Sequence, residues 1–310
     1  MFEAANCTNA PATTSSNAGI AGAGVLLSFI ITAGLALALS ASLIIQASFS
    51  RGGSGRPSTI RRKLLSSYSD QQILTGIGIQ AVGLAQMDVL VPYHFFIIWM
   101  LSLLSTAVHN ATLLALVGDF RRDWILRWLR QLLMLASLVL SCVYGIFMLQ
   151  VVQKDLEMST LPIACAWQKD IDGDGKKGSG TASNAGLSYV GTIATIAGNC
   201  IVFAGATWYL HSRSQRFFRL SQLIGIAAMS AIAIGASVRV ILLSQAFGRP
   251  TTPLSDDSEK QWSFGSLVTL LMLLLPLMSL LEIARGEIKV APPLPDDKEP
   301  LMDSEMQMGK

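Results

Sequence analysis

The chain has little charge. Asp, Glu, Lys and Arg together make up only 14% of its 310 residues, whereas a typical soluble domain has about 25%. Hydrophobic residues account for 51%, and the mean hydropathy is +0.50. These apolar residues fall in nearly uncharged runs of about 20 or more residues, which is the pattern of helices that cross a bilayer. No other segment could build a soluble core, so composition predicts a polytopic α-helical membrane protein.

Lys and Arg are absent from the start of the chain, where Glu3 is the only charged residue before the first apolar run. A cleaved signal peptide has a basic start and a short apolar core. The run from Asn17 to Gln46 is too long and lacks that start. It therefore predicts a retained first span that follows a translocated, extracytosolic tail at residues 1–19.

Several functional motifs are missing as well. The last apolar run contains no Lys for a retinal Schiff base, and the signature triplets of rhodopsin-like receptors do not occur. Walker, zinc-protease, paired-aspartate and His-rich di-iron motifs are also absent. The basic residues lie in short connections rather than on a folded domain, which argues against nucleic-acid binding. No cofactor is predicted.

Seven spans are expected, and together they form a helical bundle at residues 20–283. The second span is the most polar, but Ser69 and Gln72 form a capping box that predicts its start. Pro92 follows in a very short turn, so the second and third spans are expected to form a tight antiparallel hairpin. The Pro-rich and acidic tail at 284–310 is predicted to be disordered and cytosolic. The expected spans are 20–46, 70–87, 93–116, 128–151, 185–210, 220–246 and 262–283.

The distribution of Lys and Arg predicts the orientation. With the N-terminus outside, 15 basic residues lie on the cytosolic side and six on the other side. Basic loops are retained in the cytosol, so every connection fits a seven-transmembrane-helix bundle with an extracytosolic N-terminus and a cytosolic C-terminus. A six-span arrangement without the second span would put two basic loops on opposite sides. The cytosolic set is Arg51, Arg56, Arg61, Arg62, Lys63, Arg121, Arg122, Arg127, Arg213, Arg216, Arg219, Arg285, Lys289, Lys298 and Lys310, and the other set is Lys154, Lys169, Lys176, Lys177, Arg249 and Lys260.

Ionisable residues inside spans are costly in hydrocarbon and therefore mark candidate sites. His109 lies near the cytosolic end of the third span, next to Asn110, at the depth where the second span begins with Asp70 and Gln71. These four residues are expected to form one polar cluster. The cluster is either a set of structural hydrogen bonds between helices or a functional ligand site.

Two more ionisable residues lie nearer the outer ends of spans. His94 follows Tyr93 at the start of the third span, where the simplest interpretation is an interfacial anchor and the alternative is a ligand-binding residue. Arg239 lies about two turns from the outer end of the sixth span. It is expected either to extend outward to the interface or to pair inside the bundle. Pro276 predicts a kink in the last span.

The large outer loop contains half of a calcium-binding pattern. Asp170, Asp172 and Asp174 alternate and are followed by Gly175, as in the front of a calcium loop. Thr181 occupies the position where the final bidentate acid is required. A flexible polar loop is therefore the favoured interpretation, and a weak metal site is the alternative.

The outer tail carries two features that suit an oxidising compartment. Asn6 begins an Asn-x-Thr sequon and is expected to be glycosylated, while the second sequon at Asn110 lies inside a span. Cys7 and Cys165 are expected on the same outer side, and we predict a disulfide between them, with two free thiols as the alternative. The other two cysteines lie within spans as isolated thiols: Cys142 and Cys200.

Three short stretches carry a resemblance to a known family. The segment from Ser69 to Gly76, Tyr93-His94 and the later His109 resemble an uncharacterised family of fungal seven-span integral membrane proteins, and Pro162…Cys165 is similar too. The likeness is strongest over residues 69–110, and the Gly- and Asp-rich insertion at 170–180 departs from it. The resemblance implies the seven-span layout and a fungal source, and it implies no activity.

Three functions remain open from the sequence. The span number, orientation and short basic loops favour a receptor-like or sensory protein. An intramembrane enzyme or transporter that uses the polar cluster is the second hypothesis, and a membrane scaffold is the third. The position of a cavity would distinguish the first two hypotheses. A receptor needs a cavity near the outer ends of the spans, and an enzyme or transporter needs one at His109. The expected partners are membrane lipid and an unidentified small-molecule or lipid ligand, and the plasma membrane is the favoured location.

Overall fold

The computed structural model describes residues 7, 10–49, 59–122, 124–154, 156–167, 183–212 and 217–285. The regular secondary structure of these residues is helical, with short turns and connections and one isolated bridge between Thr14 and Leu254. The α-helices are α1 (Ala18–Ala21), α2 (Ala23–Phe49), α3 (Thr59–Ala85), α4 (Pro92–Ala115), α5 (Val117–Arg122), α6 (Trp124–Gln153), α7 (Ser183–His211), α8 (Phe218–Leu243), α9 (Phe264–Leu271) and α10 (Leu275–Ala284). Two 3₁₀ helices join them: η1 (Ile163–Trp167) and η2 (Met272–Leu274).

Helix α4 is the centre of the bundle. Every residue from Pro92 to Leu114 is buried except Phe96. The helix packs against α2, α3, α6, α7 and α8. Because it faces protein on all sides, α4 can carry polar side chains that a lipid-facing helix would exclude.

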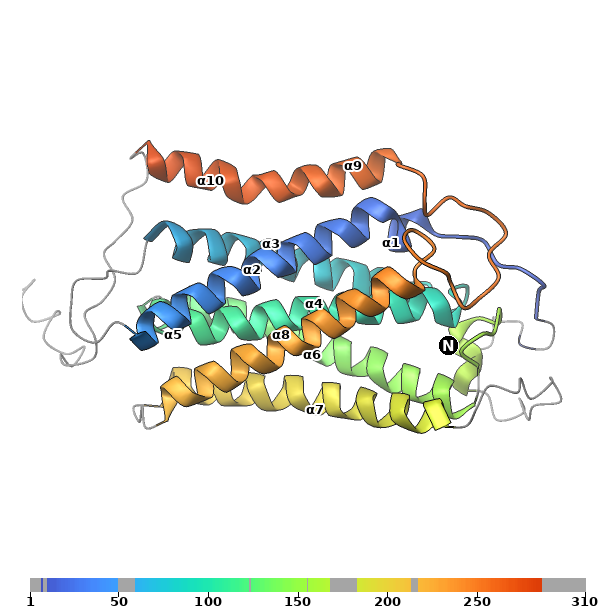
Figure 1. Ribbon diagram of the computed structural model, residues 1–310, viewed down its shortest axis with the longest axis horizontal. Coiled ribbons are helices and arrows are strands. Elements are labelled where there is room, and N and C mark those ends of the chain that lie inside the picture. Colours follow the sequence, from blue (N-terminus) through green and yellow to red (C-terminus); the bar gives the residue numbers. More distant parts are fainter. Residues whose placement is uncertain are drawn as a thin grey trace, which may run out of the picture.

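The long helices run back and forth between two ends of the bundle (Figure 1). We call one the disulfide end, formed by residues 7, 10–22, 86–91, 156–167 and 244–263. The other is the basic end, where α3 and α8 begin, α7 ends, and α5 and the start of α6 lie. The α9–η2–α10 unit packs on the outside of α2 and α3. This arrangement brings α3 and α4 together as the predicted hairpin.

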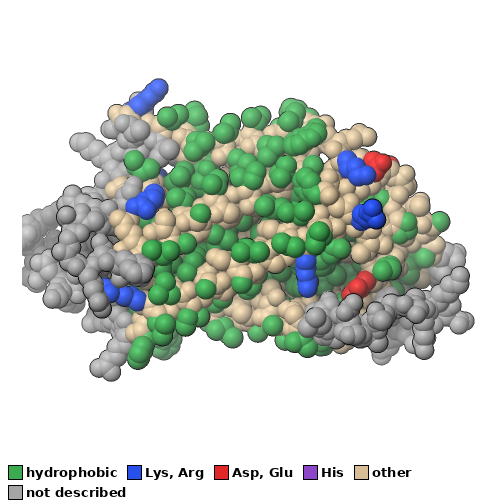
Figure 2. Space-filling view, in the orientation of Figure 1, with side chains coloured by type: hydrophobic (Ala, Val, Ile, Leu, Met, Phe, Trp, Pro, Cys, Tyr) green, Lys and Arg blue, Asp and Glu red, His purple; other side chains and the backbone are tan. Residues whose placement is uncertain are grey.

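Five helical segments within the described residues are long and apolar enough to cross a membrane: Ala18–Ala47, Pro92–Ala115, Arg127–Gln153, Tyr189–His211 and Phe218–Leu243. Apolar side chains cover the middle of the molecule in Figure 2, and most of the Lys and Arg side chains lie toward the two ends. Helix α3 has the length but is more polar, and Phe264–Met278 is a shorter apolar helix. The all-helical class, with several helices suited to a membrane, is therefore confirmed, whereas the count of seven spans and their orientation remain predictions.

The predicted start of the second span is wrong as a helix boundary. Helix α3 begins at Thr59, and Ser69 lies inside it with a buried hydroxyl that makes no hydrogen bond. The capping pattern therefore marks no N-cap. The basic residues that precede it are helical, so α3 continues beyond the expected span toward the basic end.

Small residues allow the helices to approach closely. A Cβ atom on Gly24 would lie 2.4 Å from the carbonyl oxygen of Ser266, so α2 can touch α9 only because Gly24 has no side chain. Pro276 has no N–H to donate to the carbonyl of Met272. The N–H of Leu275 donates to that carbonyl instead, which produces η2 just before the proline at which the kink was predicted.

Candidate functional site

The most buried charged group of the described residues is Glu259, in the connection between α8 and α9. Its side chain is fully enclosed. Tyr93 donates its hydroxyl to Oε2 at 2.8 Å, and Nε2 of His94 lies 2.8 Å from Oε1. The backbone N–H of Asn17 donates to Oε1 at 3.2 Å. Both carboxylate oxygens are thus occupied, as a buried carboxylate requires.

His94 is therefore not an interfacial anchor. It is 2% exposed, and its partner comes from a segment far along the chain. The neighbouring Tyr93 hydroxyl also accepts a hydrogen bond from the backbone N–H of Gln245 at 2.8 Å. The Tyr93-His94 pair consequently fastens the α8–α9 connection to the start of α4.

The N-terminal segment is fastened to the same connection. The N–H of Thr14 donates to the carbonyl of Pro253 at 3.1 Å, and the N–H of Ser255 donates back to Thr14 at 2.8 Å. Asp256 accepts hydrogen bonds from the hydroxyl of Ser16 and from the N–H of Ser258, which hold the pKa of this carboxyl well below its usual value. Residues 10–17 and 252–259 are thus joined to each other at the disulfide end, and we call these two segments the cover.

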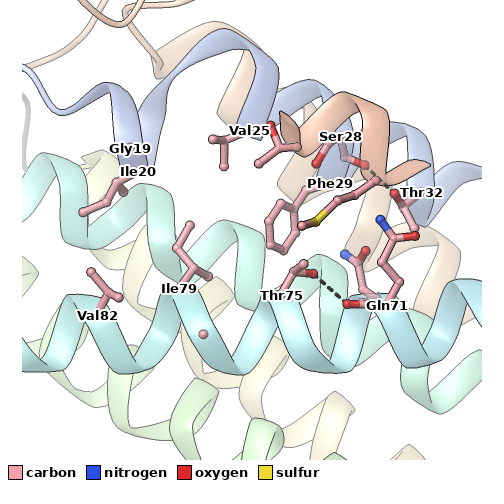
Figure 3. Close-up of a pocket in the computed structure, with 14 residues that line it drawn as sticks. Gly19, Ile20, Val25, Ser28, Phe29, Thr32, Gln71, Thr75, Ile79 and Val82 are labelled. Atoms are coloured by element: carbon pink, nitrogen blue, oxygen red, sulfur yellow. Dashed lines mark hydrogen bonds between the residues drawn. The ribbon is translucent and has the colours of Figure 1, made fainter. Parts of the chain in front are cut away.

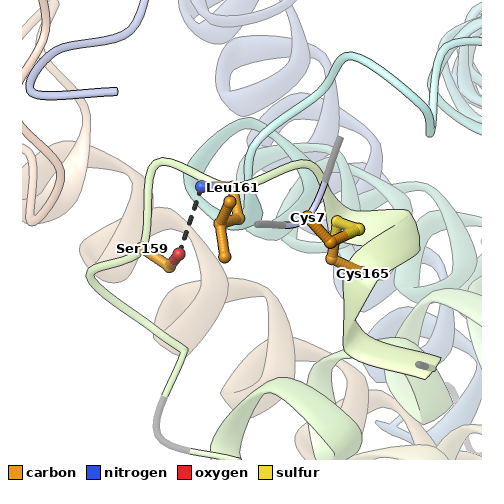
Figure 4. Close-up of a disulfide and its surroundings, with 4 residues drawn as sticks. All are labelled: Cys7, Ser159, Leu161 and Cys165. Atoms are coloured by element: carbon orange, nitrogen blue, oxygen red, sulfur yellow. Dashed lines mark hydrogen bonds between the residues drawn. A yellow bond between two sulfur atoms is a disulfide. The ribbon is translucent and has the colours of Figure 1, made fainter. Parts of the chain in front are cut away.

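A disulfide completes this cover. Cys7 and Cys165 are bonded, with their Cα atoms 5.7 Å apart, which confirms the predicted pairing. Figure 4 shows the bond at η1, near Ser159 and Leu161. The N–H of Ile163, in η1, donates to the carbonyl of Leu90 at 2.8 Å. The tail is therefore joined covalently to a segment that itself rests on the α3–α4 turn.

The predicted cluster of Asp70, Gln71, His109 and Asn110 does not form. Asn110 donates from Nδ2 to the carbonyl and side-chain oxygens of Asn199 in α7, at 3.3 and 3.4 Å. His109 is 1% exposed, and neither ring nitrogen has a hydrogen-bond partner. His109 and Asn110 point to different faces of α4. The four side chains are therefore not in contact, although their positions along the helices correspond.

Asp70 forms an ion pair between α3 and α6 instead. Its carboxylate accepts from the guanidinium of Arg130 in α6, and Arg130 also donates to Ser66 at 2.7 Å. Arg62, two turns before Asp70 on α3, pairs with Asp119 of α5. Helix α3 is thereby linked to both α5 and α6 by charge.

Arg239 does not pair inside the bundle. Its side chain lies on an exposed face of α8 and makes no ion pair with a described residue. Its position four residues before the end of α8 lets the guanidinium extend outward along the helix. Of the two expectations, the structure therefore favours the outward one.

Two thiols expected to be isolated are neighbours. The Sγ atoms of Cys142 in α6 and Cys200 in α7 lie 3.7 Å apart, and both residues are partly buried. Ser102 and Ser141 make a similar contact between α4 and α6, at 2.9 Å. Spacing along the chain gave no indication of the cysteine contact, because nothing in the sequence set the rotation of α6 against α7.

A cavity of about 240 Å³ lies between α1 and α2, α3 and the α9–η2 segment (Figure 3). Phe29 and Met272 contribute apolar walls, and Gln71 and Thr75 contribute polar groups from α3. None of its lining residues is ionisable. His109 is not among them, so this cavity is separate from the interior of α4.

Three predicted sites lie outside the described residues: the sequon at Asn6, the half calcium loop at Asp170, Asp172 and Asp174, and most of the tail at 284–310. Among the described residues, no group of three or more His, Cys, Asp or Glu side chains is placed to hold a metal ion. The glycosylation and the weak metal site remain predictions.

No family model matches the chain, and neither a curated protein nor a solved structure is similar to it. The resemblance to fungal seven-span proteins therefore remains a prediction. The case for function rests on the geometry described above.

Proposed function

We propose that the chain is a seven-span membrane protein, with the disulfide end outside the cytosol, which works as a receptor-like sensor of a ligand held inside the bilayer. In this arrangement α3 and α9–η2–α10 supply the two spans beyond the five apolar helices. The disulfide and the charge distribution support the orientation, since disulfides form in oxidising compartments and basic loops stay in the cytosol.

One relationship carries the sensory proposal. Gln71 lines the cavity, and its neighbour Asp70 forms the ion pair with Arg130 of α6. A ligand that displaces α3 at Gln71 would displace Asp70 with it. Helix shifts of about 1–2 Å are a common way for membrane and oligomeric proteins to transmit binding, and ion pairs between helices are sensitive to such shifts.

The alternatives have less support. A hydrolytic or proton-transfer site needs titratable groups next to its substrate, and the cavity has none. A transporter that uses His109 needs a cavity at that residue, but His109 is buried and does not line the cavity. A scaffold would need no cavity at all.

The sensory proposal can be tested without knowing the ligand. A Cβ atom on Gly78 would meet nothing within 4 Å, although Gly78 lines the cavity, so Gly78→Leu should fill it. Gly34 on α2 is equally open but lies outside the cavity, and Gly34→Leu is the matched control. Spin labels at Ile60→Cys on α3 and Leu132→Cys on α6, in a Cys142→Ser/Cys200→Ser background, would report the distance between these helices in lipid nanodiscs.

We expect Gly78→Leu to change the label distance by about 1–2 Å and Gly34→Leu to leave it unchanged. Equal distances in both variants and the parent would contradict the sensory proposal and favour the scaffold. The orientation has its own test. Reporter fusions after Lys260 and after Lys289 should lie on opposite sides of the membrane, and a same-side result would refute the seven-span arrangement.

The proposal places the protein in the secretory pathway, with the plasma membrane as its destination. The oxidised pair Cys7–Cys165 supports passage through an oxidising compartment. Microscopy of the full chain with a fluorescent C-terminal fusion tests this. Retention in an internal membrane would contradict the plasma-membrane assignment and leave the fold unaffected.

A further inference from the structure

The cavity between α2 and α3 is long and narrow. On α3 its wall runs from Gln71 to Val82, which corresponds to about 16 Å at the helical rise of about 1.5 Å per residue. Figure 3 shows Thr32 and Gln71 at one end and Ile20 and Val82 at the other. Its volume of about 240 Å³ is below the roughly 300–1,000 Å³ of a pocket for a drug-sized ligand. The shape suits one extended chain better than a lipid with two.

The polar groups gather at one end. Thr32 and Thr75 already donate their hydroxyls to carbonyls of their own helices, at 2.5 and 2.9 Å. Gln71 differs, because its buried Oε1 accepts no hydrogen bond. An unpaired buried amide is costly, and a ligand that carries a hydrogen-bond donor would remove that cost.

The polar end lies deep in the membrane. Gln72, beside Gln71, donates to Ser105 at 3.4 Å, and Ser105 is near the middle of α4. A charged headgroup placed there would be buried without a counter-ion, because the wall has no ionisable residue. The chemistry therefore excludes phospholipid headgroups and carboxylates at Gln71, and it favours a neutral hydroxyl, which can both donate and accept.

We propose that this cavity binds a neutral single-chain lipid alcohol, with its hydroxyl on the Gln71 carboxamide and its chain along α3 toward Val82. The binding is argued from the cavity alone. Only the effect of binding on the Asp70 ion pair rests on the proposed sensory function. The cavity lies between membrane-embedded helices, so the molecule enters from the lipid.

The test uses the full chain in nanodiscs with three probes that carry the same photoreactive diazirine in the alkyl chain: dodecanol, its methyl ether and dodecane. We expect dodecanol to label peptides within 20–32 and 71–82, at about tenfold lower concentration than the methyl ether or dodecane, and unlabelled dodecanol to compete. This comparison needs no variant. Labelling by all three probes at equal concentration would show a nonspecific lipid groove and overturn the proposal.

Variants locate the hydroxyl. Gln71→Leu should weaken dodecanol labelling about tenfold, the usual effect of losing one hydrogen bond. Gln80→Leu is the matched control, because Gln80 is a buried, unpartnered glutamine on the same helix outside the cavity. Equal losses in the two variants would overturn the role of Gln71, and unchanged labelling in Gly78→Leu would overturn the cavity as the site.

The outcomes separate ligand from function. If dodecanol fails to bind while Gly78→Leu still moves α3, the ligand class is wrong and the sensory function stands. If dodecanol binds at Gln71 while Gly78→Leu leaves the helix distance unchanged, the ligand class stands and the sensory function is wrong.

Discussion

Nε2 of His94 lies 2.8 Å from Oε1 of Glu259, although the two residues are 165 positions apart in the chain. Both side chains are excluded from solvent. The contact joins the first turn of α4, the central helix, to a connection that would otherwise be free to move over the end of the bundle. It explains how a polar segment can be held firmly beside an apolar core.

Glu259→Ala should lower the free energy of unfolding by about 3–5 kcal/mol, because it leaves His94 and Tyr93 buried without their partner. Unfolding in mixed micelles measures the change. Lys260→Ala is the control, since its exposed pair with Asp257 should contribute less than about 1 kcal/mol. Similar losses in the two variants would refute a structural role for the buried contact.

His109→Leu and Asn110→Leu should change stability in opposite directions. Removing a buried imidazole that has no partner should stabilise the fold by about 1–3 kcal/mol. Removing the Asn110 amide takes away the donor to the buried Asn199 side-chain oxygen and should destabilise by a similar amount. The same unfolding assay compares the two adjacent positions. Destabilisation by His109→Leu would show that the imidazole has a partner that matters.

Cys7→Ser should lower the free energy of unfolding by about 2–4 kcal/mol, because the disulfide closes a long loop. Cys142→Ser, which removes a thiol outside that bond, should have a smaller effect. Mass measurement after alkylation checks the pairing directly. Modification of both Cys7 and Cys165 without prior reduction would contradict the bond.

Asn6 should carry an N-linked glycan when the chain passes through the secretory pathway. Glycosidase treatment should then shift the gel mobility of the wild type but not of Asn6→Gln. Asn110→Gln is the control, because Asn110 is 2% exposed within α4 and should not be modified. A shift that persists in Asn6→Gln would assign the glycan to another position.

The sequence was sufficient for the features that composition controls. Long apolar runs predicted the five apolar helices, because a span of about 30 Å must satisfy its backbone internally and expose apolar side chains. The disulfide was predictable for a similar reason. Once Cys142 and Cys200 were assigned to spans, Cys7 and Cys165 were the only pair left on one side.

Contacts between helices were harder to predict from the sequence. Depth along a helix follows from residue number, but the direction in which a side chain points depends on how each helix is rotated against its neighbours. Asp70 and His109 were predicted together because they share a depth, yet Asp70 turns to Arg130 on α6. Arg130 itself was a signal in the sequence, as an ionisable residue inside the predicted fourth span, and it was overlooked.

The role of Glu259 could not be read from its surroundings. It stands in the run Asp256-Asp257-Ser258-Glu259-Lys260, where the other charged residues are exposed and only this carboxylate turns inward. His94 was likewise interpreted as an anchor at the interface because its partner was not identifiable. A polar stretch of sequence predicts that its side chains are exposed to solvent. A hydrogen-bond partner far along the chain can nevertheless bury one of them.

The bond between Cys7 and Cys165 also imposes an order on biosynthesis. Synthesis proceeds from the N-terminus, so with the proposed orientation Cys7 reaches the oxidising compartment well before Cys165 exists. The bond can close only after α2, α3, α4 and α6 have been inserted. A chain that stalls earlier carries a reactive thiol on its tail, and a finished chain does not. With the proposed orientation, the redox state of the tail therefore distinguishes a chain in which these four helices have been inserted from one that stalled before them.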